Sequence, residues 1–560
     1  MTNQIDNTSC PKTPLLNVLF GIKKWFTKGR CILLGVLIVL FVFFYNPTKI
    51  ERLFYAIPEE AIVSVYVNSL SKEWDAAMDN NMLMGSASVI SQEDLSDLRS
   101  NEGLKWTLRL LTGKDSVVAA IDGNGDKKFD LRSGDYLAGA TSIGFRRRIM
   151  ELLWHIKYVP GLGELGVKNG IRYLDFSKHK VGPSPRNPVL ALDVVDGMLI
   201  VAFTSNVDDL LAVKKRVVTR SNIANVFTIT DEPWKLRTSK AIPKNFIVWS
   251  TFYDGIVGIS SFKSKNLEVR LLDVSDKTQA IMGKMMNFDE LGVSAEKIAA
   301  RYASAEDMVV GFVFNTSICS LESLFGVTGK PIEAAEPNEL VTITALSGSN
   351  AFELLGNRLP SIHLSTTQKK LKEGDSEIEM LLIDILKNNK VTSTGPQQYR
   401  SIYTPKVKGF DLIAANIKFG LYYEKDNELY NMGLAPLNAV KAGTELPVNS
   451  ISGAYTVGDM LDFFGEECGS SYFIGYCNIK ELSKLTNMLQ ANLKLATMFG
   501  VKLNKEDIRT VNTITLVVDK LSEADTLSVG ISRIDDKKTI NLLKSDEVYC
   551  LSLNLTGKDK

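Results

Sequence analysis

Residues 62–78, IVSVYVNSLSKEWDAAM, join a β-rich run directly to an amphipathic helix pattern. Residues 62–67 are rich in β-branched side chains, which favour strands. Apolar residues then recur at helical spacing from Leu70 to Met78. Asn68 and Ser69 lie between the two patterns, where a small polar side chain commonly caps a helix. The segment therefore predicts a strand that leads straight into a capped helix.

Similar strand-to-helix segments follow along the chain. Three of them place an acid three positions after the capping residue, which is the spacing of a capping box; they are Ser205/Asp208, Thr456/Asp459 and Asn478/Glu481. Their irregular spacing excludes a solenoid of fixed period. The pattern predicts tandem, degenerate strand-to-capped-helix units that arose by duplication.

Turn signals between β-rich runs predict antiparallel hairpins. Asp196-Gly197 and Asp254-Gly255 each separate two such runs, and Asp-Gly is a preferred type I′ turn. Further hairpins are expected near residues 425–427 and 522–525. Hairpins that alternate with helices predict an α+β fold, with antiparallel sheets whose helices pack on one face.

Length and composition limit the number of domains and the classes of partner that fit this chain. The chain has 560 residues, and at about 100–200 residues per domain it holds several domains. We expect three α+β domains, at residues 57–235, 236–365 and 400–560. The composition, 45% apolar and 23% charged, excludes a mainly disordered chain. A net charge of +1 argues against nucleic acid as a partner, because phosphate binding needs a positive excess.

Residues 31–45, CILLGVLIVLFVFFY, carry no charge. A spanning helix needs about 17–25 apolar residues, and the stems of Lys28 and Arg30 can extend the apolar length. Trp25 and Tyr45 lie where interfacial aromatic residues belong. The run predicts one transmembrane anchor. A cleaved signal peptide is the alternative, but no small-x-small cleavage site follows closely.

Charge asymmetry around this run predicts its orientation. The leader, residues 1–30, is basic, through Lys12, Lys23, Lys24, Lys28 and Arg30. After the run, Lys49 and Arg52 are accompanied by Glu51, Glu59 and Glu60. The positive-inside rule then places the N-terminus in the cytoplasm. We expect a protein of the inner (cytoplasmic) membrane, in contact with lipid through residues 31–45, with a periplasmic or extracellular C-terminal part.

One motif resembles a calcium-binding loop. Asp122, Asn124, Asp126 and Asp130 supply oxygen atoms at positions 1, 3, 5 and 9 of such a loop. Position 6 is Lys127 instead of glycine, and position 12 is a serine instead of an acid. The motif is therefore a candidate calcium site, and the alternative is a solvated turn between two strands. No other cofactor is expected.

Catalytic signals are sparse. Ser69 and Lys72 match S-x-x-K, a nucleophile motif, but no S-D-N or K-T-G triplet follows, so Ser69 is interpreted as a helix cap. The chain has only three histidines, the usual general bases near neutral pH. Four cysteines, Cys319, Cys468, Cys477 and Cys550, follow the apolar run, and either disulfides or buried thiols fit them.

The segment Ile57-Pro58-Glu59-Glu60-Ala61, with the strand and helix after it, resembles the start of the ectodomain in uncharacterised membrane-anchored bacterial envelope proteins. The resemblance covers about 25 residues, implies an envelope setting and supplies no catalytic residue. Together with the missing catalytic constellation, it favours a non-enzymatic binding or scaffolding ectodomain whose partner is a protein or a lipid of the envelope. The alternatives are an anchored hydrolase of envelope polymers that uses carboxylates, and a lipid-binding carrier.

Overall fold

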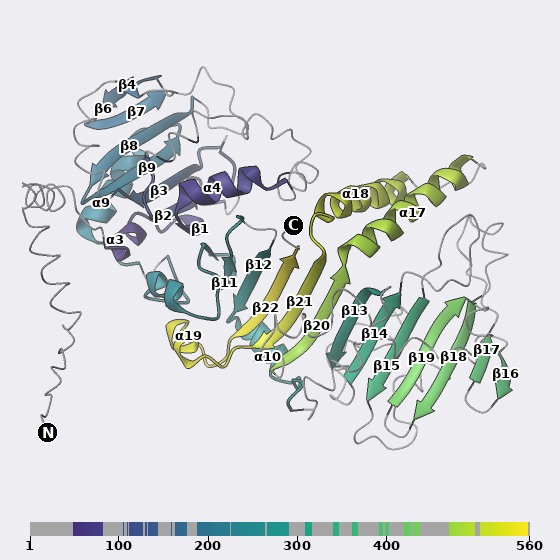
Figure 1. Cartoon of the computed structure of the whole chain (residues 1–560). Coiled ribbons are helices and arrows are strands. Elements are labelled where there is room, and N and C mark those ends of the chain that lie inside the picture. Colours follow the sequence, from purple (N-terminus) through teal and green to yellow (C-terminus); the bar gives the residue numbers. More distant parts are fainter. Residues whose placement is uncertain are drawn as a thin grey trace, which may run out of the picture.

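The computed structural model describes residues 49–81, 112–126, 129–131, 133–143, 158–159, 163–175, 187–223, 226–263, 266–290, 308–315, 340–346, 361–367, 391–395, 398–401, 419–426, 429–436, 470–498 and 505–557, with the single residues 84, 105, 109 and 111. In these ranges one antiparallel sheet of 18 strands dominates, accompanied by few helices (Figure 1). The predicted α+β class with antiparallel strands is confirmed.

Ten strands of the sheet come from the first half of the chain. They are β1 (Ala61–Asn68), β2 (Asp115–Ile121), β3 (Tyr136–Ser142), β6 (Gly166–Lys168), β7 (Ile171–Asp175), β8 (Val189–Val195), β9 (Met198–Thr204), β10 (Phe246–Ser250), β11 (Tyr253–Ile259) and β12 (Leu267–Asp273). A separate short pair consists of β4 (Tyr158–Val159) and β5 (Gly163–Glu164).

Eight strands come from the second half. They are β13 (Met308–Asn315), β14 (Leu340–Leu346), β15 (Ser361–Thr367), β18 (Phe419–Asp426), β19 (Leu429–Pro436), β20 (Ser471–Asn478), β21 (Thr526–Arg533) and β22 (Tyr549–Thr556). A second separate pair consists of β16 (Val391–Gly395) and β17 (Gln398–Ser401).

The two halves meet where β12 pairs with β22, from Leu267 opposite Leu555 to Asp273 opposite Tyr549. Outward from this seam, the first half places its strands in the order β12, β11, β10, β1, β2, β3, β9 and β8. The second half places β22, β21, β20, β13, β14, β15, β19 and β18. Each half therefore follows the same order outward from the seam. Its last three strands come first, in reverse chain order, then its first three strands in chain order, and then two further strands in reverse chain order.

One helix precedes β1, and the other helices lie in connections between strands. In chain order, the helices are α3 (Glu51–Phe54), α4 (Leu70–Asp79), α9 (Asp209–Thr219), the 3₁₀ helix η2 (Pro233–Thr238), α10 (Asp276–Met282), α17 (Ile479–Met498), α18 (Lys505–Leu521) and α19 (Lys537–Leu542). Helices α17 and α18 form a hairpin between β20 and β21, whereas β10 and β11 are joined by a short turn at Thr251 and Phe252.

The main core lies on one face of the central strands, here called the core face. It contains Tyr66, Ile247, Ile256, Leu272 and Cys550, which are almost fully buried under α3, α9, η2 and the α19 segment. The ring of Phe54 from α3 packs edge-on against Trp249, with 5.8 Å between the ring centres. The core also takes Ile534, Leu543 and Val548 from the second half, so the two halves share it.

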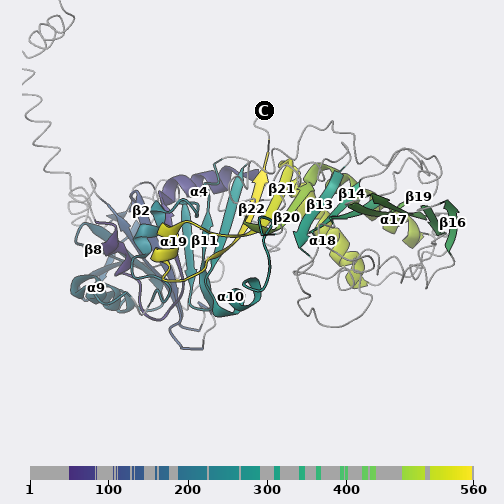
Figure 2. The same cartoon turned by 90° about the horizontal axis from the view of Figure 1, so that it is seen from below.

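The other side of the sheet, here called the opposite face, also carries helices. Leu267, Val269, Leu553 and Leu555 on this face pack with Ile479 of α17 and Val518 of α18. Figure 2 shows α4 and α9 on different sides of the strands. The expectation of helices on one face is therefore wrong. Many strands are apolar at consecutive positions, as in Met198–Thr204, so both faces can be packed.

The Asp-Gly turns have different outcomes. Asp196 and Gly197 join β8 to β9 with φ of 49° and 80°, as a type I′ turn requires, so this prediction is confirmed. The prediction for Asp254-Gly255 is wrong, because both residues lie inside β11. Pairing of Gly255 with Asp273 of β12 draws them into the sheet.

The two remaining hairpin predictions also differ. β18 and β19 pair on either side of residues 427–428, close to the predicted turn at 425–427. Residues 522–525 instead connect the end of α18 to the start of β21. The segment before residue 522 is thus a helix, and β21 pairs with the more distant β20.

The predicted boundary near residue 235 falls inside continuous structure. β1 pairs directly with β10, from Val63 opposite Ser250 to Val67 opposite Phe246, across that boundary. The predicted anchor, residues 31–45, lies outside the described residues, as do the leader and Cys319 and Cys468. Among the helices that the structure does describe, none has the length and apolar character needed to span a bilayer.

Candidate functional site

The turn between β1 and α4 holds an unusual backbone conformation. Ser69 has φ of 67° and ψ of 65°, the left-handed region, which costs a non-glycine residue about 1–2 kcal/mol. Its amide donates to the carbonyl of Lys114, and the amide of Asn68 donates to the carbonyl of Asn245 at 2.7 Å. The Ser69 side chain makes no capping hydrogen bond. Ser69 therefore occupies the predicted N-cap position of α4, but its side chain does not make the hydrogen bond of a cap.

A pocket of about 720 Å³ opens beside this turn. Its wall comes from the ends of β1, β2 and β3, from the first turn of α4 and from the residue before β10. The lining residues are Asn68, Ser69, Ser71, Lys72, Glu73, Thr112, Gly113, Lys114, Ser142, Ile143 and Asn245. Most of these residues carry polar side chains, so the pocket offers hydrogen-bonding groups to a ligand.

Two lysines give the pocket its positive charge. Lys72 lies in the first turn of α4, and Lys114 directly precedes β2. Neither ammonium group has an ion-pair partner in the part of the chain that the structure describes. The N-terminal amides of α4 add positive partial charge at the same place. These groups together favour an anion in the pocket.

Glu73 also lines the pocket but serves the fold. Its side chain is buried, and Oε1 accepts a hydrogen bond from Asn245 Nδ2 at 2.7 Å. Oε2 accepts from Ser261 Oγ at 2.9 Å and from the Phe262 amide at 3.3 Å. The carboxylate thus ties α4 to the segments that flank β10 and β11. With both oxygens occupied by neutral donors, it leaves the lysines as the charged groups available to a ligand.

The predicted calcium ligands lie in the connection between β2 and β3. Asp122 Oδ1 accepts from the amides of Asn124 at 3.0 Å and Gly125 at 2.6 Å. Asn124 Nδ2 donates to the carbonyl of Ser133 at 2.8 Å. Asp126 and Asp130 are exposed. These contacts hold the connection in a compact turn.

A further acid that the sequence did not single out stabilises this turn. Asp135, 1% exposed, accepts from the amides of Gly123 at 2.9 Å and Asp130 at 2.6 Å. Over the described residues, no group of three or more His, Cys, Asp or Glu side chains is arranged to hold a metal ion. The calcium site stays a prediction, to be checked by calcium titration.

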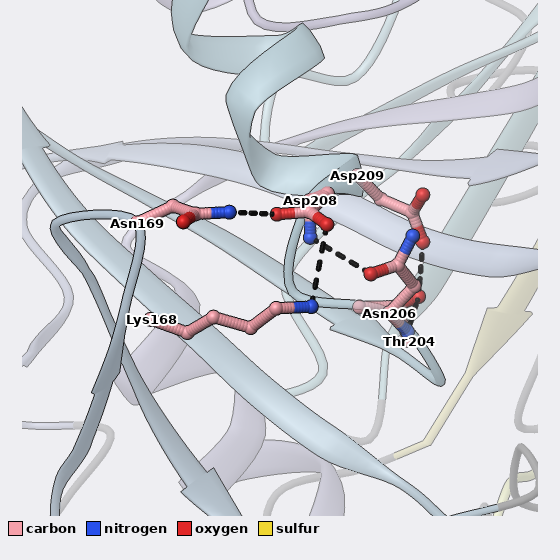
Figure 3. Close-up of polar contacts among 6 residues, drawn as sticks. All are labelled: Lys168, Asn169, Thr204, Asn206, Asp208 and Asp209. Carbon is pink, nitrogen blue, oxygen red and sulfur yellow. Dashed lines mark hydrogen bonds and ion pairs between the residues drawn. The ribbon is translucent and has the colours of Figure 1, made fainter.

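A second polar cluster joins the β6–β7 hairpin to the start of α9 (Figure 3). Asn169 Nδ2 donates to Asp208 Oδ1 at 2.9 Å, and Lys168 Nζ lies 3.3 Å from Asp208 Oδ2. These two contacts hold the pKa of Asp208 below its ordinary value. Burial raises the pKa of Asp209, whose carboxylate accepts from Thr204 Oγ1. Each polar group faces another in the cluster, so the cluster fastens a hairpin tip to a helix.

The other predicted caps also have separate outcomes. Asn478 Oδ1 accepts from the Glu481 amide at 3.1 Å, which is the expected capping bond. At α9 the N-cap residue is Asp208 and not the predicted Ser205. The amide of Asp208 donates a hydrogen bond to Asn206 Oδ1 at 3.2 Å. Thr456 and Asp459 lie outside the described residues.

Neither of the described cysteines after the apolar run forms a disulfide. Burial raises the pKa of the Cys477 thiol to about 11, so the thiol stays protonated near neutral pH. Cys550 is fully buried, and its Sγ lies 3.3 Å from Ser552 Oγ. Both therefore act as structural thiols.

Sequence reasoning missed the pocket, although it singled out Ser69 and Lys72. Lys114 joins them only because β2 pairs with β1, where Asn68 lies opposite Asp115. Comparison of the chain with protein-family models, with curated proteins and with solved structures found no match. The site must therefore be interpreted from its own chemistry.

This chemistry supports binding more readily than covalent catalysis. A serine nucleophile needs a base hydrogen-bonded to its Oγ, and Ser69 Oγ has no such bond to a described residue. Two ammonium groups, several hydroxyls and the start of a helix can instead hold phosphate or carboxylate oxygens through charge-assisted hydrogen bonds.

Proposed function

We propose that this chain is a single-pass membrane-anchored envelope protein whose ectodomain binds a ligand and does not catalyse a reaction. The ligand class is a small anion with phosphate or carboxylate groups, bound in the β1–α4 pocket. The observation that carries the proposal is that Lys72 and Lys114 both line one pocket and that neither has a carboxylate partner among the described residues.

The architecture supports a binding role within this proposal. The common strand order of the two halves supports duplication of one α+β unit, as the sequence predicts. The apolar run at residues 31–45 and its basic leader support an inner-membrane anchor with the sheet outside the cytoplasm. Only residues 46–50 separate the predicted anchor from α3 at Glu51 in the sequence, which supports an ectodomain held near the membrane surface.

Isothermal titration of the full chain with inorganic phosphate and with citrate tests the proposal. We expect K72A/K114A to weaken binding by at least about tenfold, because hydrogen bonds to charged groups contribute about 1.5–3 kcal/mol each. The matched control is K215A/K240A, which removes the same charge from exposed positions outside the pocket. Equal loss in both variants, or no binding by the unmodified chain, would contradict the proposal.

A further inference from the structure

The sequence contains two Asn-Gly pairs, Asn124-Gly125 and Asn169-Gly170, and both lie in turns that the structure describes. Asparagine is a thermolabile residue, most of all before glycine, because no side chain then shields the next backbone nitrogen. Both pairs are exposed, and their glycines have φ of 75° and 78°. No atom of the described residues lies within 4 Å of the place where a Cβ would stand on either glycine. The two pairs are therefore alike in exposure, glycine conformation and free space.

Hydrogen bonds hold both groups of the Asn124-Gly125 pair. The Gly125 amide donates to Asp122 Oδ1 at 2.6 Å. Asn124 Nδ2 donates to the carbonyl of Ser133 at 2.8 Å. The Asp122 carboxylate also opposes loss of the Gly125 amide proton, because a second negative charge would then lie beside it. The Gly125 nitrogen is thus a poor nucleophile in this turn.

The Asn169-Gly170 pair leaves its backbone nitrogen free. The Gly170 amide makes no hydrogen bond to a described residue. Within the described part of the chain, Asn169 Nδ2 makes one hydrogen bond, to Asp208 Oδ1 at 2.9 Å (Figure 3). Lys168 Nζ lies 3.3 Å from Asp208 Oδ2, so a positive charge also lies near this turn. The Gly170 nitrogen therefore lacks the restraint that the Gly125 nitrogen has.

We propose that Asn169 is a site of spontaneous deamidation, and that this modification releases the β6–β7 hairpin from α9. The Gly170 nitrogen gives up its proton and attacks Cγ of Asn169, so a C–N bond forms, and the Cγ–Nδ2 bond breaks with loss of ammonia. Water then opens the cyclic imide to aspartate or isoaspartate. The net reaction consumes one water, releases one ammonia and needs no oxidant or reductant. Neither residue lines the β1–α4 pocket, so this site is independent of the proposed ligand.

The new carboxylate cannot replace the amide of Asn169. Carboxylate oxygens only accept hydrogen bonds, so the bond to Asp208 is lost and two negative charges face each other. Asp208 is the N-cap residue of α9. At the other end of α9, Arg216 Nε donates to the carbonyl of Ile57, just before β1, at 3.1 Å. Release of the hairpin therefore loosens the start of a helix whose end is tied to the segment before the first strand.

The test of the site is incubation of the full chain at mildly alkaline pH, with peptide mass spectrometry at successive times. We expect Asn169 to be converted at least about tenfold faster than Asn124, because the Gly125 amide must first give up its hydrogen bond to a charged group. A synthetic peptide of residues 164–175, in which no other part of the chain holds the turn, is the reference. Equal or faster conversion of Asn124, or an unconverted Asn169 when the peptide is fully converted, would overturn the site.

Hydrogen exchange measured by mass spectrometry tests the release of α9 separately. Over residues 209–219, the incubated chain and Asn169→Asp should both exchange faster than the fresh chain, because the first turn of α9 opens more often. The matched control is Asn124→Asp, which makes the same chemical change in the β2–β3 connection and should leave exchange over α9 unaltered. Unchanged exchange in both the incubated chain and N169D, or an equal increase in N124D, would overturn the release.

Discussion

At the scale of single residues, Ser69 and Asn478 occupy the same kind of position, between a strand and the helix that follows it. Asn478 lends its side chain to the helix, since Oδ1 accepts from the Glu481 amide. Ser69 is held in the left-handed region and leaves its hydroxyl in the wall of the pocket. A backbone conformation that costs energy and points a polar group at a cavity is characteristic of functional sites.

We expect Asn478→Ala to lower the free energy of unfolding by about 1 kcal/mol, because a helix cap is lost. Ser69→Ala should change it by less than about 0.5 kcal/mol, since the Ser69 side chain makes no capping hydrogen bond. Ser69→Gly should raise it by up to about 1 kcal/mol, because glycine adopts positive φ without strain. Urea unfolding followed by circular dichroism measures all three variants. A Ser69→Ala loss as large as that of Asn478→Ala would show that the serine does cap the helix.

At the scale of elements, short hairpins are positioned by polar contacts to neighbouring helices. The turn between β6 and β7 consists of Asn169 and Gly170, both with positive φ. Asn169 thereby serves twice, as a turn residue and as the donor to Asp208 at the start of α9. The cluster in Figure 3 is therefore a structural connection whose strength depends on pH.

Asp208 and Asp209 should affect this connection with opposite signs. The pKa of Asp208 is lowered in the folded state, so its stabilising effect is present above the unfolded pKa and is lost as pH falls through the folded value. The pKa of Asp209 is raised, so its charged form destabilises the fold near neutral pH and protonation relieves this.

Thermal unfolding as a function of pH checks these signs. We expect Asp209→Asn to raise the midpoint at neutral pH, because Oδ1 of asparagine still accepts from Thr204, and the gain should shrink in acid. Asp208→Asn should lower the midpoint at neutral pH and have little effect in acid. The reverse order of the two variants at neutral pH would contradict the assignment.

At the scale of the whole molecule, the seam between β12 and β22 is supported by a core that both halves build. Ser239 Oγ lies 2.5 Å from Thr539 Oγ1, and Gln279 Nε2 donates to Ser545 Oγ at 2.9 Å. Ile534, Leu543, Val548 and Cys550 from the second half complete the core under the first half's strands. Residues 534–548, which contain α19, therefore pack with the first half although they lie near the end of the chain.

Dividing the chain between residues 300 and 301 should separate this shared core. Each buried aliphatic side chain contributes about 1.5–3 kcal/mol, and a domain is stable by only about 5–15 kcal/mol. We expect the N-terminal fragment to be unstable alone and to co-purify with the C-terminal fragment when both are expressed together. Val548→Asp in the C-terminal fragment should abolish co-purification. A lone N-terminal fragment with the thermal midpoint of the full chain would refute the shared core.

Local sequence patterns determined the α+β class, the type I′ turn at Asp196-Gly197 and the cap at Asn478, because each depends on neighbouring residues and on backbone geometry. The tertiary structure decided what depends on pairing between distant segments. It placed Asp254-Gly255 inside a strand, brought Lys114 beside Ser69 and Lys72, and joined both halves into one sheet. Hydrophobic runs without alternation carry no information on which face is buried or which strand is the partner. Only the assembled sheet could therefore produce the pocket beside Ser69.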